Sequence, residues 1–449
     1  MTAPSMSWFS IVRMGLVQTA LGAIVVLTTS TINRVMVVEL ALPAMIPGVL
    51  VALHYALQSL RPRWGHGSDV GGRRTPWIVG GMAVLGIGGV GAAVATAVIA
   101  SNFAAGFAIA VVAFTMVGIG VGATGTNLLA MLATHVAAER RAAAATIVWM
   151  MMIAGFIVTT ITVGSFLDPF STTRLVAVTS AVSAIAFLIA TAALYKLEDA
   201  RLDQRAAAQP ADEAAAPFRQ SLSQVWEEPQ ARRFAIFIFV SMLAYSMQDL
   251  ILEPFAGIVF NLTPGQTTKL SGLQNGGVFC GMLLVALAAN PRVGFGSLKV
   301  WTVAGCFGSA VALLALVASG ITTDIAAMRI AVVGLGVANG AYAVAAIGSM
   351  MALAASGRRK REGMRMGIFG AAQALSFGAG GFLGTVAVDV IRRFVEMPGT
   401  AYAAVFFFEA LLFVVSAVLA VRATETRHAA ELEVPGSRED GELTPAMPR

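Results

Sequence analysis

Charge is what this sequence has least of. Only 12% of its 449 residues are Asp, Glu, Lys or Arg, half the share of about one quarter that is usual in soluble domains. Hydrophobic residues make up 57%, so the composition excludes a disordered chain and a soluble enzyme. Cysteine is also scarce, and both Cys280 and Cys306 lie in apolar runs. The sequence therefore predicts an integral membrane protein without a disulfide framework or a cysteine metal site.

Long apolar runs fill most of the chain. A helix needs about 20 apolar residues to cross a bilayer, and twelve runs of suitable length are present, near residues 12–32, 42–60, 76–99, 104–134, 143–166, 173–195, 233–260, 270–289, 299–319, 325–355, 364–390 and 401–421. We expect an all-α membrane protein with 12 transmembrane helices in two six-helix bundles. The bundles would cover 1–195 and 233–422, with a linker at 196–232 and a disordered tail at 423–449.

Basic residues orient these spans. The five alternate connections that begin with Arg61–Thr75 carry 19 Lys and Arg, whereas the opposite loops and their helix ends carry 6. Lys and Arg are enriched in cytoplasmic loops, so both termini are predicted to be cytoplasmic. The net charge of +6 then reflects membrane orientation, and no nucleic-acid partner is expected.

The two halves show weak similarity to each other at an offset near 216 residues. Val117–Gly122 matches Val333–Ala338, and the pair Arg140–Arg141 recurs as Arg358–Arg359. Six plus six spans with a cytoplasmic linker are the arrangement of the major facilitator superfamily, in which parallel halves surround a central cavity. The repeat therefore predicts this fold.

The loop after the second span resembles the G-x-x-x-D-x-x-G-R-[KR] signature of major facilitator proteins. Its matching residues are Gly65, Asp69, Gly72, Arg73 and Arg74. Glycine permits a tight turn, and the aspartate can pair with arginine or cap a helix. An ordinary basic loop is the alternative. The second-half loop Pro291–Lys299 has no acidic residue, so any such latch is one-sided.

Charged residues within spans are costly and are candidates for function. Arg34 and Glu39 lie near the end of the first span, and Gln248, Asp249 and Glu253 lie in the seventh. We hypothesise that Arg34 pairs with Asp249 or Glu253 across the two halves, as a gate or ligand clamp. The alternative is a local pair between Arg34 and Glu39.

His54 lies in the middle of the second span and is a candidate pigment ligand. A neutral imidazole can bind metal ions, including the magnesium of a chlorophyll. A packing or hydrogen-bonding role is the alternative for a lone histidine in a helix. The sequence contains no P-loop, no metal-ligand cluster and no arrangement of nucleophile and base, so we expect no enzymatic activity and no covalently bound cofactor.

Two polar segments are similar to signatures of the PucC/LhaA family. They are Leu27–Leu40 (LTTSTINRVMVVEL) and Tyr245–Gly257 (YSMQDLILEPFAG), and the resemblance extends from about Met14 to Val421. The loop Arg61–Trp77 resembles most the branch that is labelled a chain of bacteriochlorophyll synthase. The family belongs to the major facilitator superfamily and delivers bacteriochlorophyll during assembly of light-harvesting antennae.

The resemblance implies a multi-pass protein of the bacterial inner, intracytoplasmic photosynthetic membrane. It implies bacteriochlorophyll or a precursor as ligand, and bacteriochlorophyll synthase or light-harvesting polypeptides as partners in the lipid bilayer. The alternatives are a proton-coupled exporter of a small molecule and a ligand-free assembly scaffold. Proton coupling needs a membrane-embedded carboxylate; the first span has only Glu39 at its end and the fourth has no charge, which weakens the exporter, while Asp249 and Glu253 keep it open.

Overall fold

The computed structural model describes residues 6–61, 64, 73–198, 226–288, 294–355 and 362–432. These residues form helices and short connections, without a strand. Eleven of the described helices are long and apolar enough to cross a membrane, and a shorter apolar helix, Met45–Leu57, lies at the predicted second span. The predicted all-α membrane architecture is therefore confirmed.

The first half contains six spans, of which the first is irregular. It begins as a regular helix and continues through two wide π-helical turns to Glu39, well beyond the predicted end near residue 32. The elements are α1 (Trp8–Val26), η1 (Leu27–Thr31), α2 (Ile32–Arg34), η2 (Val35–Glu39), α3 (Met45–Leu57), η3 (Gln58–Leu60), α5 (Thr75–Ile99), α6 (Phe103–His135), α7 (Ala138–Phe166) and α8 (Thr172–Leu194).

The second half repeats this order, and here the seventh span is broken near its middle. The elements are α11 (Pro229–Met247), η4 (Gln248–Leu250), α12 (Leu252–Val259), α13 (Pro264–Ala288), α14 (Leu298–Thr322), α15 (Ile325–Ala355), α16 (Glu362–Ile391) and α17 (Pro398–Leu432). Because α17 continues to Leu432, the tail predicted to be disordered from residue 423 begins as a helix. Residues 199–225 of the predicted linker and 433–449 of the tail lie outside the described residues.

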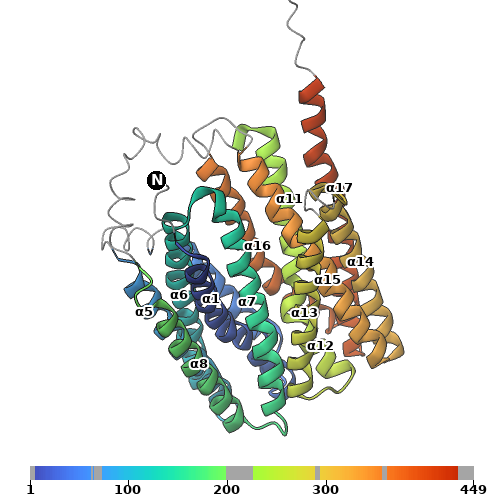
Figure 1. Cartoon of the computed structure of the whole chain (residues 1–449). Helices are drawn as coiled ribbons and strands as arrows, with labels where there is room; N and C mark the ends of the chain where they lie inside the picture. The colour runs from blue at the N-terminus through green and yellow to red at the C-terminus, as the bar shows by residue number, and fades with distance from the viewer. Residues whose placement is uncertain are drawn as a thin grey trace, which may run out of the picture.

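The spans cross the bundle in alternating directions. The first span runs from Trp8 to Glu39, so we name the two ends of the bundle the Trp8 end and the Glu39 end. Figure 1 shows the N-terminus and the end of α17 at the same, upper end of the bundle, as an even number of spans requires. The start of α1 and the end of α17 therefore both lie at the Trp8 end.

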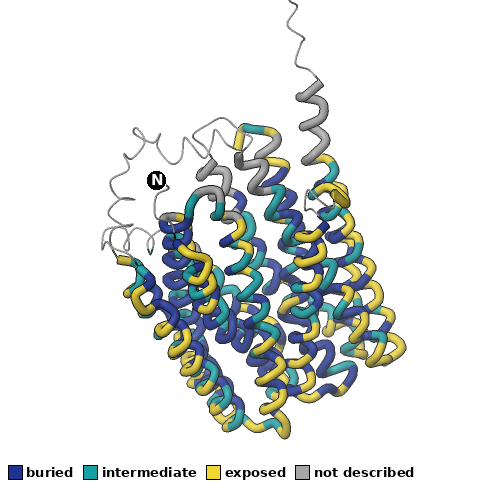
Figure 2. Tube along the Cα trace, viewed as in Figure 1, coloured by how far each residue is buried: buried dark blue, intermediate teal, exposed yellow. Residues whose placement is uncertain are grey.

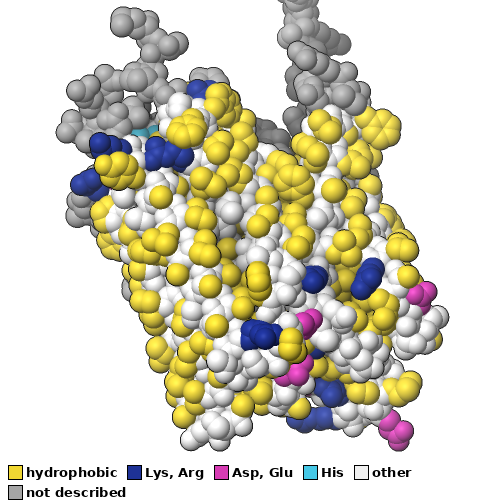
Figure 3. All heavy atoms as spheres, turned by 60° about the horizontal axis from the view of Figure 1, so that its bottom comes forward, with side chains coloured by type: hydrophobic (Ala, Val, Ile, Leu, Met, Phe, Trp, Pro, Cys, Tyr) yellow, Lys and Arg dark blue, Asp and Glu magenta, His cyan; other side chains and the backbone are white. Residues whose placement is uncertain are grey.

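Apolar side chains cover the flanks of the bundle. Figure 2 shows buried residues along the inner faces of the helices and exposed residues along the outer faces, and many exposed positions are large and hydrophobic, including Ile330, Val311 and Leu188. Figure 3 shows this apolar surface on the flank and several charged side chains toward the Glu39 end. Such an arrangement fits a helix bundle that is surrounded by lipid.

Glycines let the helices of each half approach closely. A Cβ atom added at Gly281 of α13 would lie 2.1 Å from the carbonyl oxygen of Val337 in α15. Gly118 of α6 faces His54 of α3, and Gly336 of α15 faces Gln274 of α13. These two glycines make equivalent contacts in the two halves and lie 218 residues apart, whereas their partners His54 and Gln274 lie 220 residues apart. The sequence match near 216 is displaced because it aligns glycines that face different helices.

Candidate functional site

The wide turn of the first span begins where hydroxyl side chains compete for backbone carbonyls. The Thr28 hydroxyl donates a 2.8 Å hydrogen bond to the carbonyl of Val25, and the Thr29 hydroxyl donates to the same carbonyl at 3.0 Å. Such bonds loosen the regular helical ladder, and π-helical turns are frequent at functional sites. The turn places Ser30, Thr31 and Asn33 in the buried interface between the halves.

The seventh span breaks because of Pro254. A proline has no backbone N–H, so the carbonyl of Leu250, four residues earlier, loses its ordinary helical donor. The side-chain nitrogen of Asn33 takes that place with a 2.8 Å hydrogen bond to the Leu250 oxygen. The polar segment of the first span therefore repairs the backbone of the seventh, across the two halves.

Glu253 lies in the same interface and is 2% exposed. One of its oxygens accepts hydrogen bonds from the hydroxyls of Ser30 and Ser271, which lie 3.0 Å from each other. The other oxygen has no hydrogen-bond partner among the described residues. The buried carboxyl is thus held by neutral donors, one from each half.

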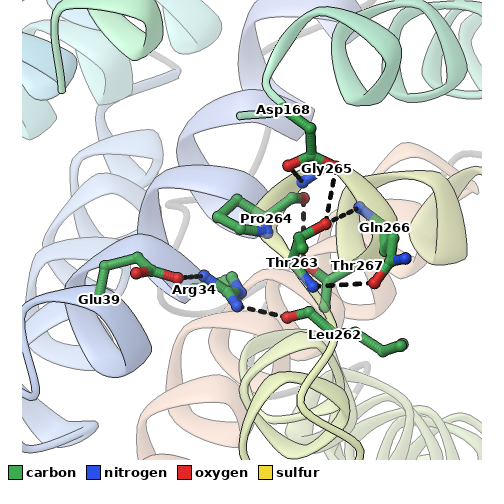
Figure 4. A network of polar contacts seen from close by, with 9 residues as sticks. All are labelled: Arg34, Glu39, Asp168, Leu262, Thr263, Pro264, Gly265, Gln266 and Thr267. Atoms are coloured by element: carbon green, nitrogen blue, oxygen red, sulfur yellow. Dashed lines mark hydrogen bonds and ion pairs between the residues drawn. The ribbon is translucent and has the colours of Figure 1, made fainter. Parts of the chain in front are cut away.

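Arg34 is 2% exposed and pairs with Glu39, one turn further along its own span. Its other terminal nitrogen donates a 2.7 Å hydrogen bond to the carbonyl of Leu262 in the second half (Figure 4). The hypothesised direct pair with Asp249 or Glu253 is therefore not what the structure shows: the turn of η2 brings Glu39 to Arg34 first. Gly257 leaves room for the guanidinium, since a Cβ there would lie 3.0 Å from it.

A pair of aspartates ties the halves together at the Glu39 end. Asp168, after α7, accepts a 2.7 Å hydrogen bond from the Thr263 hydroxyl and a 3.2 Å bond from the Gly265 N–H at the start of α13 (Figure 4). The Thr263–Gln266 pair forms a capping box there, with bonds of 3.0 and 3.2 Å. Asp168 of the first half thereby accepts hydrogen bonds at the start of a helix in the second half.

Asp389, near the end of α16, makes the matching contact in the opposite direction. Its carboxylate accepts hydrogen bonds from the backbone N–H groups of Ala44 at 3.0 Å and Met45 at 2.7 Å. These donors belong to the start of α3, where a helix has no partners of its own. The fifth and eleventh spans are equivalent in the repeat, so each half caps the second span of the other.

Asp249 differs from its neighbours because its side chain is exposed whereas Gln248 and Leu250 are buried. Asp249 follows Tyr245 of α11 by one helical turn along the seventh span. The ring of Phe377 lies 5.8 Å from the ring of Tyr245 and 5.8 Å from that of Tyr55 in α3 of the first half, measured between centroids. The exposed carboxylate therefore lies on the same span as Tyr245, one turn from a cluster of three aromatic rings that joins the two halves.

His54 is 1% exposed. Its Nε2 lies 3.2 Å from the side-chain nitrogen of Gln58, and its Nδ1 has no hydrogen-bond partner among the described residues. The proximity of Gly118 places the backbone of His54 against α6. A pigment would reach this ring only if the surrounding helices moved apart, so its role as a ligand stays a prediction.

The candidate loop signature is only partly described. Gly65, Asp69 and Gly72 lie outside the described residues. The backbone N–H groups of Arg74 and Thr75, at the start of α5, donate hydrogen bonds to Glu198, the second at 3.0 Å. Burial would raise the pKa of Glu198, but these bonds and the nearby Arg73 outweigh it and hold the pKa below its ordinary value of 4.5.

Sequence reasoning missed three carboxylates that the structure places in notable positions. Asp168 and Asp389 are at span ends, and their partners lie 95 or more residues away, so no local pattern reveals the contacts. Glu409 is fully buried in α17, and its signal was present as a lone charge in the twelfth apolar run. Gln248, which was predicted, is buried and has no side-chain hydrogen bond to described residues.

No group of three or more His, Cys, Asp or Glu side chains is placed to hold a metal ion among the residues that the structure describes. What the interface offers instead is a set of buried hydroxyl, amide and carboxyl groups at the Glu39 end. One exposed carboxylate with aromatic neighbours lies beside them. This arrangement is suited to holding the two halves together at that end.

Twelve spans in two repeated halves define a membrane protein with the major facilitator fold. Solved structures agree: a D-xylose–proton symporter superposes with a TM-score of 0.70 at 15% identity, covering 92% of this chain and 97% of that one. The nucleoside transporter NupG superposes with a TM-score of 0.66 at 13% identity, covering 93% and 99%.

Within this fold, the chain belongs to the PucC family, because the family model described as PUCC protein matches residues 31–428. The bacteriochlorophyll synthase 44.5 kDa chain of Rhodobacter capsulatus is 51% identical over 429 residues, which are 95% of this chain and 98% of that protein. Protein PucC of the same organism is 28% identical over 435 residues, covering 92% and 91%.

Proposed function

We propose that this chain is a bacteriochlorophyll-handling protein of the bacterial photosynthetic membrane. In this proposal it binds the pigment and passes it to bacteriochlorophyll synthase or to light-harvesting polypeptides, and it carries out no catalytic step itself. The observation that carries the proposal is 51% identity, over nearly the whole of both chains, to a relative named as a chain of bacteriochlorophyll synthase.

The space between the halves has chemistry that suits such a ligand. The macrocycle of a chlorophyll is flat and largely apolar, and its central magnesium accepts a ligand from one face. Tyr55, Tyr245 and Phe377 offer aromatic surface, and aromatic rings favour stacked or edge contacts with other rings. Magnesium prefers oxygen ligands, so the exposed Asp249 is a better placed candidate than the buried His54.

The orientation of the protein is part of the proposal. The start of α1 and the end of α17 lie at one end of the bundle (Figure 1), and the excess of Lys and Arg in the connections at that end supports a cytoplasmic location for it. Pigment made or carried on the cytoplasmic side would then approach from the Trp8 end. The Glu39 end, tied by Asp168 and Asp389, would be the closed end.

A proton-coupled transporter is the second candidate function. The exposed Asp249 favours it, because an exposed carboxylate within a span can bind and release a proton during transport. A ligand-free scaffold for the synthase or antenna polypeptides is the third candidate function, and the experiment must distinguish it from the other two.

The test is purification of the full chain in mild detergent from a bacterium that makes bacteriochlorophyll. The proposal expects pigment absorption that copurifies with the chain, falls strongly in Asp249→Asn, and is unchanged in Glu396→Gln, a control at an exposed carboxylate. His54→Leu tests the second candidate ligand in the same preparation.

Each other outcome contradicts the proposal in a different way. Copurification of synthase or antenna polypeptides without pigment would indicate a scaffold. Uptake of a small solute into vesicles that depends on a pH gradient, with no bound pigment, would indicate a transporter.

A further inference from the structure

Two serines and one glutamate from three different spans meet in the buried interface between the halves. Ser30 belongs to the wide turn η1 of the first span, Glu253 to α12 and Ser271 to α13. Oε1 of Glu253 accepts hydrogen bonds from both hydroxyls, and the two serine oxygens lie 3.0 Å apart. None of the three side chains has a role in the proposed function.

These three side chains make more contacts than they have hydroxyl protons. A serine hydroxyl donates only one proton, and both protons point to Oε1 when Glu253 is an anion. The contact between the two serine oxygens then sets lone pairs against lone pairs at 3.0 Å. An additional positive charge is therefore required in the cluster, either a proton or a cation.

The second carboxylate oxygen of Glu253 favours a cation over a proton. This oxygen, Oε2, is buried and has no hydrogen-bond partner among the described residues. A proton shared among Oε1 and the two serine oxygens would leave Oε2 as an unpaired buried acceptor, and a proton on Oε2 would be an unpaired buried donor. Either arrangement is destabilising. A cation instead uses Oε2 as a ligand, together with the free lone pairs of the two serine oxygens.

No cationic side chain of the described residues neutralises Glu253. Arg34 lies in the same interface, but its ion pair is with Glu39, and its other terminal nitrogen donates to the carbonyl of Leu262. Lys269 of α13 is exposed and makes no ion pair with Glu253. Because Arg34 and Glu39 neutralise each other, one monovalent cation balances the charge that remains on Glu253.

The surrounding atoms suit a small, hard cation, since such ions prefer oxygen ligands. Thr267 lies one turn before Ser271 on the same face of α13 and is 0% exposed. Its hydroxyl donates a 3.1 Å hydrogen bond to the carbonyl of Pro264, so only its lone pairs are free. In secondary transporters, interrupted helices coordinate sodium, and the spans that supply Ser30 and Glu253 are both irregular at this level.

We propose that Ser30, Glu253 and Ser271 bind one sodium ion between the two halves. Sodium is small enough to contact two oxygens that lie 3.0 Å apart, whereas the larger potassium ion holds its ligands further from each other. Ser30 belongs to the first half and the other two residues to the second, so the site is complete only while the halves are in contact. Sodium binding therefore favours the arrangement in which the Glu39 end is closed. This site goes beyond pigment handling and does not depend on it.

The test is equilibrium binding of radioactive sodium to the purified full chain in detergent, at neutral pH and constant ionic strength, with choline replacing sodium. The proposal expects saturable binding of one ion per chain, which potassium displaces only weakly. The midpoint of thermal unfolding should rise with sodium concentration and not with potassium, because the ion binds only the folded chain.

Three variants locate the ion. Glu253→Gln removes the charge, so we expect no saturable binding. Ser271→Ala removes one ligand and should lower the sodium affinity by about tenfold, the effect of one contact with a charged group. Glu396→Gln, at an exposed carboxylate, should bind sodium as the unmodified chain does. Ser271→Ala is a small change, so it decides the question even if Glu253→Gln does not fold.

The proposal is overturned if the unmodified chain binds no sodium, if potassium competes equally, or if Ser271→Ala keeps the full affinity. A thermal midpoint that depends on pH through Glu253, and not on sodium, would show that the cluster holds a proton instead. Pigment absorption is measured separately in the same variants, so either proposal can fail alone.

Discussion

The two ends of the bundle are fastened in different ways. At the Glu39 end, helix starts are capped by the opposite half, as Asp168 caps α13 and Asp389 caps α3. At the Trp8 end, Glu198 caps α5 from within its own half, and Arg13 donates a 2.9 Å bond to the carbonyl of Ala193 in that same half. The first set of contacts resists separation of the halves, whereas the second only stabilises one bundle.

This difference indicates that the two halves separate more easily at the Trp8 end than at the Glu39 end. Cross-half contacts at the Glu39 end include a buried arginine, an asparagine that repairs a broken span, and a carboxyl held by serines of both halves. To expose the space between the halves at this end, all of them must break together. The four predictions that follow test this comparison, in order of decreasing effect.

Arg34→Met is expected to have the largest effect. It leaves the buried Leu262 carbonyl without its charged donor, a loss of about 1.5–3 kcal/mol, and it removes the ion pair with Glu39, whose carboxylate is exposed. The free energy of unfolding, measured in mixed micelles, is expected to fall by about 3 kcal/mol. Adding Glu39→Gln should recover part of this loss, while adding Glu253→Gln should not. Recovery by Glu253→Gln instead would show that Arg34 pairs across the halves.

Asn33→Leu comes next and separates backbone repair from packing. The Leu250 carbonyl would then be buried without a donor, which costs about 2 kcal/mol. Pro254→Ala restores a backbone N–H four residues later, so the double variant should recover most of the stability. If the double variant were no more stable than Asn33→Leu alone, the role of Asn33 would be packing only.

The two aspartate caps are expected to be equivalent. Asp168→Ala and Asp389→Ala should each lower the free energy of unfolding by about 1 kcal/mol, the usual effect of removing an N-cap side chain. Cysteines introduced near the Glu39 end should also become more reactive toward a thiol reagent, because the halves separate more readily. Markedly unequal effects would show that the repeat does not make these contacts equivalent.

Glu198→Gln is expected to have the smallest effect and to leave the Glu39 end unchanged. The folded state holds the pKa of Glu198 below 4.5, so its contribution to stability is present above that pH and is lost as the pH falls through the folded value. Thermal unfolding at pH 7 and below pH 4.5 should show a smaller pH dependence in Glu198→Gln than in the unmodified chain. A cysteine at the Glu39 end should keep its reactivity in this variant.

Sequence reasoning located the spans and the polar stretches within them, because apolar length and rare charge are local properties. It gave three candidate partners of Arg34, namely Asp249, Glu253 and Glu39, but could not choose among them, since the choice depends on the path of the turn from Val35 to Glu39. It placed the first span end near residue 32, because Arg34 and Glu39 interrupt the apolar run although the helix continues. It also ended the twelfth helix too early, since hydropathy marks the end of a lipid-facing run and α17 continues to Leu432 as a helix.

The sequence by itself determined that this is a membrane protein of two repeated halves with a polar segment in its first and seventh spans. Its scarcity of charge and its long apolar runs allow little else. Only the tertiary structure decided what those polar residues do, because Asn33 meets Leu250 and Asp389 meets α3 only after distant helices have packed. Hydropathy is summed along the chain, whereas hydrogen bonds need partners that only folding brings within reach.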